Sequence, residues 1–296
     1  MARRRRSGGW VAAGWVVGLW LLQPQAMAAA ERPVTASLIA ESSTVGPGDP
    51  NWVGVHLVMA AGWHTYWKNP GDSGLPTTVT WEMPGGFQVG PIQWPSPRRL
   101  EAPFGVNFGY EGDVLLLAKV QGPATVTSGQ EVQVRARVDW VACKDICVKG
   151  GAELDATWVV GEPLVPDARW VNAFQRARAR LPRPAAGWAL AARDHGTMLI
   201  LEVAQPSGDL PTHVELMFFP EEPGVVEPSA PQRHPRRVFR GPDRLLLTPS
   251  SFLTARPERL RGVLVVRQGG QDQAVAVDVP VSSGDARGTP ALREGG

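Results

Sequence analysis

The sequence is poor in cysteine and in long apolar runs, and each shortage excludes a class of protein. Its 296 residues include only two cysteines, too few for a small scaffold held together by several disulfides. Beyond the first 30 residues, no stretch approaches the 18 apolar residues typical of a membrane-spanning helix. No Ser/His/Asp set, phosphate-binding loop or pair of catalytic carboxylates stands out either. The cysteine pair is therefore the main candidate for chemistry.

The N-terminus has the three-part layout of a secretory signal peptide. A basic cluster at 3–6 is followed by an apolar stretch at 10–22 and by small residues around Ala26, Ala28 and Ala30. We predict a signal peptide over residues 1–30 and an exported mature protein, with an uncleaved anchor as the alternative. Removing the first 28 residues takes away four arginines and no acid, which leaves 26 basic and 28 acidic side chains. Without a basic excess, nucleic-acid binding has little electrostatic support.

The remaining sequence is typical of β structure, with short alternating apolar runs between Gly, Pro, Asn and Asp residues. In "EVQVRARVDW" the apolar residues occupy every second position, as in a half-buried antiparallel strand. One helix is predicted within 167–182, with Asp167 as its N-cap. We therefore predict an all-β protein with two tandem β-sandwich domains, at 31–162 and 163–281, the second led by the helix. A disordered tail is predicted at 282–296.

The two cysteines, in "VDWVACKDICVKGG", are four positions apart. On one continuous strand Cys143 and Cys147 would be about 13 Å apart, too far for a disulfide. Lys144 and Asp145 tolerate a turn, so a tight hairpin with one cysteine on each arm fits better. Three interpretations remain at this point: a stabilising disulfide, a redox-active pair, or half of a metal site completed by His56 or His64. A loop this short gives a structural disulfide only about 2 kcal/mol of entropic stabilisation.

Two further segments, "GWHTYWKNPGDSGLPTTVTW" and "GPIQWPSPRRLEAPFGVNFGYEGDVLLLAKV", precede the cysteine segment. Taken in this order, the three segments resemble the N-terminal periplasmic domain of the thiol:disulfide interchange protein DsbD. The resemblance covers roughly residues 35–160 and is greatest to ScsB-type proteins, which are linked to copper tolerance. It implies an immunoglobulin-like first domain in the periplasm, whose cysteine pair carries electrons and needs no cofactor or metal.

The resemblance also implies roles for individual residues. Cys147 matches the cysteine that forms mixed disulfides with partners, and Cys143 matches its resolving mate. Phe104, in "EAPFG", matches the aromatic residue that shields the pair. Tyr66 matches a tyrosine beside the active site, and His64 replaces another aromatic residue there.

The sequence departs from the family pattern around the shielding residue. Ala102 and Pro103 stand where enteric relatives have acidic residues, and only Glu101 is acidic nearby. The spacing between the cysteines is also shorter. Lys144 and Lys149 lie close to the cysteines in sequence, where their positive charge would favour a thiolate. The alternative is that both are solvated turn residues.

The resemblance implies a protein-disulfide reductase component that works with other proteins. The membrane segments and the thioredoxin-like domain of full-length family members are absent, so we expect electrons from a CcdA- or DsbD-like membrane donor or a thioredoxin-like protein. The expected acceptors are periplasmic disulfide isomerases or cytochrome c maturation thioredoxins. The alternative is a non-catalytic β-sandwich binding module with a structural disulfide. His195, His213 and His234 are interpreted as surface or hydrogen-bonded residues.

Overall fold

Eighteen helices and strands are assigned in the part of the chain that the computed structural model describes. The described residues are 32–46, 51–103, 105–125, 127–161, 163–205, 210, 213–235 and 241–283. The predicted signal peptide, Phe104 and most of the predicted tail lie outside these ranges. The described residues group into one compact body, within which two β-rich halves have cores of their own.

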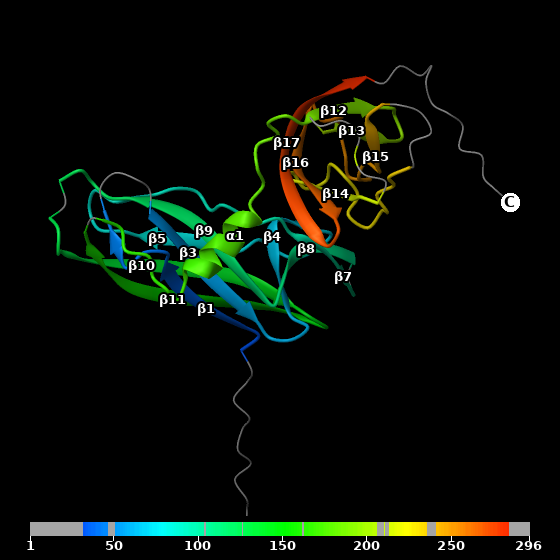
Figure 1. The fold of residues 1–296 in the computed structure, drawn as a ribbon. Coiled ribbons are helices and arrows are strands. Elements are labelled where there is room, and N and C mark those ends of the chain that lie inside the picture. Colours follow the sequence, from blue (N-terminus) through cyan, green and yellow to red (C-terminus); the bar gives the residue numbers. More distant parts are fainter. Residues whose placement is uncertain are drawn as a thin grey trace, which may run out of the picture. The chain divides into compact units, whose positions relative to one another are not determined.

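Two sheets face each other in the first half of the chain (Figure 1). The smaller sheet has the order β1 (Val34–Ala40), β3 (Asn51–Met59), β9 (Asp113–Gln121), β6 (Gln88–Val89). The larger has the order β2 (Thr44–Val45), β11 (Cys147–Val160), β10 (Glu131–Cys143), β4 (His64–Gly71), β8 (Gly105–Glu111), β7 (Arg98–Ala102), and β5 (Thr78–Glu82) also pairs with β10. The sandwich predicted for this half is confirmed.

Strand β10 shows why this sequence forms a sandwich. Its residues from Glu131 to Trp140 alternate strictly between exposed and buried, as the period of two predicts. The buried set packs between the sheets and is Val132, Val134, Ala136, Val138 and Trp140. In Figure 1, β10 and β11 run side by side over their whole length, and thirteen residue pairs join them without a register shift.

The predicted helix is α1 (Val171–Ala179), and it packs on the first sandwich. Phe174 and Ala177 are buried against residues of β1 and β9. The prediction of Asp167 as N-cap is wrong, because the residue preceding the helix is Trp170, which has no side-chain cap. The Asp167 carboxylate instead accepts hydrogen bonds from the backbone and side chain of Arg169.

The second half forms another sandwich-like unit with its own core. Its strands follow the order β14 (Glu215–Pro220), β16 (Arg259–Gln268), β17 (Gln271–Ser283), β12 (Ala189–Asp194), β13 (Leu199–Ala204), β15 (Asp243–Leu247). β17 pairs with β16 over most of its length and with β12 only at its last three residues. Because β17 joins β16 to β12 in this way, it links the two parts of the sheet, and a hydrophobic core that includes Leu201, Phe218 and Leu245 lies within it.

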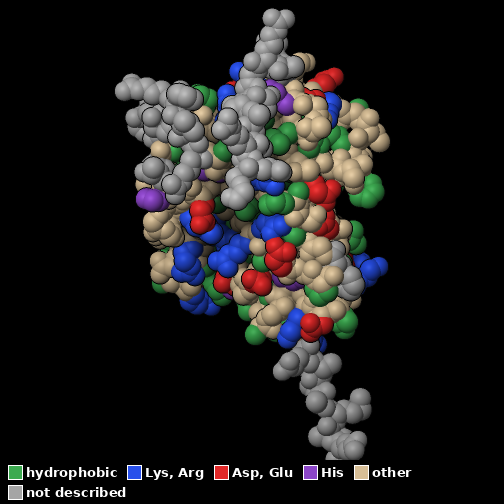
Figure 2. Space-filling view, turned by 90° about the vertical axis from the view of Figure 1, so that its right-hand side faces the viewer, with side chains coloured by type: hydrophobic (Ala, Val, Ile, Leu, Met, Phe, Trp, Pro, Cys, Tyr) green, Lys and Arg blue, Asp and Glu red, His purple; other side chains and the backbone are tan. Residues whose placement is uncertain are grey.

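Arginines on the second unit are largely neutralised by nearby acids. Arg267 pairs with Asp272, and Arg259 pairs with Asp278. Figure 2 shows basic and acidic side chains intermixed on the face drawn. Such exposed pairs contribute about 0–1 kcal/mol each, so they shape the surface charge more than the stability.

Candidate redox site

The two cysteines lie at the end of the longest hairpin in the first sandwich. Cys143 is the last residue of β10 and Cys147 the first of β11, and the two are direct cross-strand partners. Their Cα atoms are 4.1 Å apart, and a disulfide joins their sulfur atoms. The predicted hairpin with one cysteine on each arm is therefore confirmed. On its other side Cys143 pairs with His64 of β4.

The two cysteines differ in their exposure to solvent. Cys143 is buried, with 3% of its surface exposed, whereas Cys147 is exposed. Ile146, directly before Cys147, leaves 64% of its surface in solvent. A thiolate must approach a disulfide sulfur directly to attack it, so Cys147 is the more accessible cysteine for an external thiol.

Tyr66 supplies a polar group to the buried sulfur. Its hydroxyl donates a hydrogen bond to Cys143 Sγ over 2.7 Å and lies 3.9 Å from Cys147 Sγ. Burial raises the pKa of Tyr66, more than the Ser73 hydroxyl lowers it. The phenol therefore keeps its proton and remains a donor at neutral pH. A hydrogen bond to a developing thiolate would stabilise Cys143 as the leaving group.

His64 is held beside Tyr66 by a second polar network. The rings of His64 and Tyr66 meet edge to face, with centroids 5.2 Å apart. Asn107 accepts a hydrogen bond from Ser73 through Oδ1, which leaves its Nδ2 to donate to His64 Nε2 over 3.1 Å. This arrangement requires an unprotonated Nε2. Burial also lowers the pKa of His64, against a smaller opposite effect of Glu111.

The other predicted site residues are placed differently. Glu101, on β7, is exposed and pairs with Arg99, and β8 and β4 separate β7 from β10 in the sheet. Phe104 lies outside the described residues. The side chain of Lys144 runs along Gly62, and Lys149 is exposed opposite Val141. Within the described ranges neither Lys144 nor Lys149 forms an ion pair.

Comparison with known proteins agrees with this geometry. Residues 32–157 match the family model described as thiol:disulfide interchange protein DsbD, N-terminal. The resemblance predicted from the sequence is thereby confirmed for this part of the chain. The fold is similar to the N-terminal periplasmic domain of ScsB from Proteus mirabilis, with a TM-score of 0.54 at 16% identity, covering 88% of this chain and 97% of that one.

Other comparisons add no argument about function. A titin I-band fragment (12% identity, 86% of this chain and 67% of that chain covered) has a TM-score of 0.19. The sporulation control protein Spo0M from Bacillus subtilis (11% identity, 83% of this chain and 91% of that chain covered) has a TM-score of 0.21. A search of curated protein sequences finds no match. None of the helices in the described ranges has the length and apolar character needed to cross a membrane.

Sequence reasoning missed three residues of the candidate redox site. Asn107 is 1% exposed and Ser73 lies in a turn, and both are far from the cysteines in sequence. Gly74 is in the left-handed region at φ +96°, and a Cβ built there would lie 2.1 Å from Tyr66 Cζ. Gly74 therefore lies directly against the Tyr66 ring. The glycines of "GDSG" were the available signal for a tight turn.

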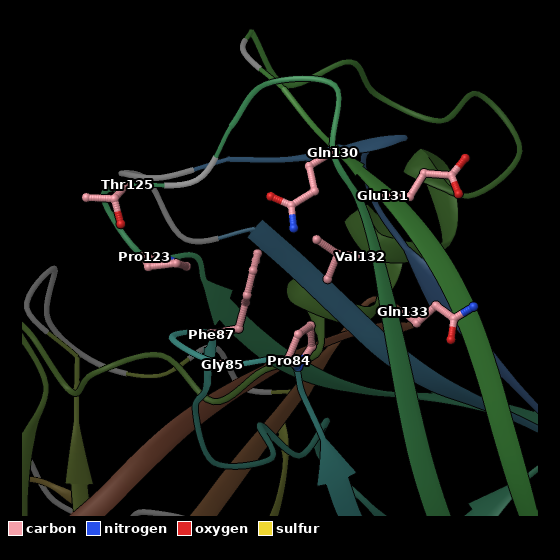
Figure 3. Close-up of a pocket in the computed structure, with 9 residues that line it drawn as sticks. All are labelled: Pro84, Gly85, Phe87, Pro123, Thr125, Gln130, Glu131, Val132 and Gln133. Atoms are coloured by element: carbon pink, nitrogen blue, oxygen red, sulfur yellow. The ribbon is translucent and has the colours of Figure 1, made fainter.

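A hollow of about 390 Å³ lies at the other end of β10. Its lining includes Phe87, Pro123 and Gln130, and Figure 3 shows Glu131 and Gln133 pointing away from it. Twelve residue-to-residue steps of extended strand, about 40 Å, separate Glu131 from Cys143. The hollow is therefore not part of the redox site.

Proposed function

We propose that this protein is an exported thiol–disulfide exchange module. It relays reducing equivalents from a membrane or thioredoxin-like donor to disulfides of periplasmic proteins through Cys143 and Cys147. The observation that carries the proposal is the asymmetry of the pair, in which an exposed Cys147 is bonded to a buried Cys143 that accepts a hydrogen bond from Tyr66. The family match over residues 32–157 supports the same chemistry.

Reduction of the pair begins when a donor thiolate attacks Cys147 Sγ. A mixed disulfide forms, the Cys143–Cys147 bond breaks, and Cys143 leaves as a thiolate beside the Tyr66 hydroxyl. The second thiol of the donor, as its thiolate, then attacks the donor sulfur of the mixed disulfide and releases the Cys147 thiolate. Two electrons have moved to this protein, and the donor is left as a disulfide.

Transfer to the client repeats these steps in the opposite direction. The Cys147 thiolate attacks a client disulfide and releases one client thiolate. Cys143 then attacks Cys147 Sγ, which restores the internal disulfide and releases the second client thiolate. The client thiolates take up two protons from solvent. The expected clients are disulfide isomerases or cytochrome c maturation thioredoxins, and the expected donor is a CcdA- or DsbD-like membrane protein.

The proposal includes an order of domains. Residues 1–30 direct export, 31–162 carry the redox chemistry, and 163–281 form a second β-sandwich domain with a leading helix, α1, which packs on the first sandwich. Among the described residues, no group of three or more His, Cys, Asp or Glu side chains could hold a metal ion. The proposed reaction is written entirely with the two cysteines and their partners.

The proposal can be tested with the disulfide itself and with two single variants. Titration against glutathione should give a reduction potential above about −300 mV, the value below which structural disulfides resist reduction. The variant C143S, which keeps the exposed thiol, should react with oxidised glutathione at least about tenfold faster than C147S, because exchange requires an accessible thiolate. A potential far below this limit, or equal rates for the two variants, would contradict the proposal.

A further inference from the structure

The end of β14 contacts β4 directly after Tyr66. The Phe219 ring meets Trp67 edge to face with centroids 6.3 Å apart. Asn69 Nδ2 donates a hydrogen bond to the Pro220 carbonyl over 2.8 Å, and Lys68 forms an ion pair with Glu221. Three successive residues of the redox-site strand are thus held by three successive residues of the second sandwich.

Phe219 also reaches the neighbouring strand β8. Its ring lies 5.2 Å from that of Phe108, again edge to face. Phe219 is 3% exposed and belongs to the same core cluster as Trp67 and Phe108, together with Val263 and Val265 of β16. Hydrophobic burial of this kind restrains relative motion that a polar interface between two domains would allow.

Phe219 contacts the rings of Trp67 and Phe108. Each of these residues directly follows, in the sequence, a residue of the polar network at the redox site. Trp67 follows Tyr66, which donates to Cys143, and Phe108 follows Asn107, which donates to His64. Consecutive side chains of a strand point to opposite faces. A change in the packing of Trp67 or Phe108 therefore tilts the backbone that aims Tyr66 or Asn107.

We propose that Phe219 is a positioning residue for the redox site. It acts through Trp67 and Phe108 to keep the Tyr66 hydroxyl on the sulfur of Cys143. Through Phe219 the second sandwich would take part in the exchange reaction. The inference rests on the proposed function above.

The adjacent residue on β14 provides a matched control. Phe218 has the same side chain and is also fully buried, but it packs in the core of the second unit. F218A and F219A thus each remove a buried ring from neighbouring positions of one strand. Only F219A removes the contacts with Trp67 and Phe108.

The experiment uses the chain with both sandwiches and measures the rate at which dithiothreitol reduces the disulfide. We expect F219A to react about tenfold more slowly than wild type, the scale of one lost hydrogen bond to a charged group. F219L, which stays apolar but loses the edge-to-face contacts, should show a smaller loss, and F218A should keep the wild-type rate. In the double variant Y66F/F219A the losses should not add, because both changes remove the same hydrogen bond.

Several results would overturn the inference. They are a wild-type rate in folded F219A, an equal loss in F218A, or additive losses in the double variant. If F219A does not fold, the rate of disulfide reduction in F219L replaces that of F219A as the test. A wild-type rate in F219L then counts against the inference. A wild-type disulfide that dithiothreitol and glutathione cannot reduce would instead refute the proposed function.

Discussion

Replacing Tyr66 by phenylalanine tests the central contact of the site. The change removes the hydroxyl that lies 2.7 Å from Cys143 Sγ and keeps a ring that is fully buried. A hydrogen bond to a charged group contributes about 1.5–3 kcal/mol, and one pKa unit corresponds to about 1.4 kcal/mol. We therefore expect Y66F to raise the pKa of the Cys143 thiol by about 1–2 units.

The same loss has a kinetic and a redox consequence. A leaving thiolate of higher pKa departs more slowly, so the disulfide of Y66F should be reduced by dithiothreitol about tenfold more slowly, as a loss of about 1.4 kcal/mol implies. Y66F also removes stabilisation from the reduced form, in which Cys143 is a thiolate. The reduction potential of the Cys143–Cys147 disulfide should therefore become more negative by about 30–65 mV at a pH where Cys143 is ionised.

Tyr110 supplies the control for Y66F. It is also buried, and its hydroxyl donates over 2.7 Å to the Pro95 carbonyl and not to a sulfur. Y110F should therefore leave the thiol pKa and the exchange rate unchanged, even if it lowers stability. Titration of the thiolate absorbance and stopped-flow reduction measure both quantities. An unchanged thiol pKa in Y66F would refute the role assigned to this hydroxyl.

Two further predictions concern the surroundings of Tyr66. Burial lowers the pKa of His64 below 6.5, so the unfolded chain binds this proton more readily and stability should fall as the pH drops below about 6.5. Urea unfolding at pH 7.5 and 5.5 should show a smaller loss for H64Q than for wild type or the remote H195Q, and equal losses would contradict this reasoning. G74A should lose at least about 1–2 kcal/mol from its φ of +96° and slow disulfide reduction, because the added Cβ displaces Tyr66. G112A, at φ +72° with no atom within 4 Å of the added Cβ, should lose stability but keep the wild-type rate.

Part of the fold could be predicted because strands such as β5, β10 and β11 alternate between more exposed and more buried residues. The alternation in β10 gave both the strand and its inward residues, and two strand patterns flanking Lys144 and Asp145 gave the cysteine hairpin. β4 does not show this alternation. Its first four residues, His64 to Trp67, are all buried, one face lying against the cysteines and the other in the core that Phe219 joins. A strand covered on both faces has no period of two.

The polar network of the site was beyond prediction for a different reason. Asn107 and His64 are 43 positions apart, and Tyr66 and Cys143 are 77 apart. Their contacts depend on the strand order β10, β4, β8, which no local pattern specifies. The resemblance to DsbD placed Tyr66 near the cysteines, but it gave no indication of Ser73, Gly74 or Asn107.

The burial of Cys143 runs against the pattern of its own strand. Counting by twos along β10, Cys143 falls on the same face as Arg137 and Asp139, which are exposed, and its cross-strand partner Cys147 is exposed as well. Cys143 is buried on this outer face because Tyr66 covers its sulfur, and Gly74 permits that position since any side chain there would meet the Tyr66 ring. The difference between the two sulfurs therefore arises from β4 and the turn after it. Changes in this cover should alter which sulfur is attacked without altering the hairpin that holds the pair.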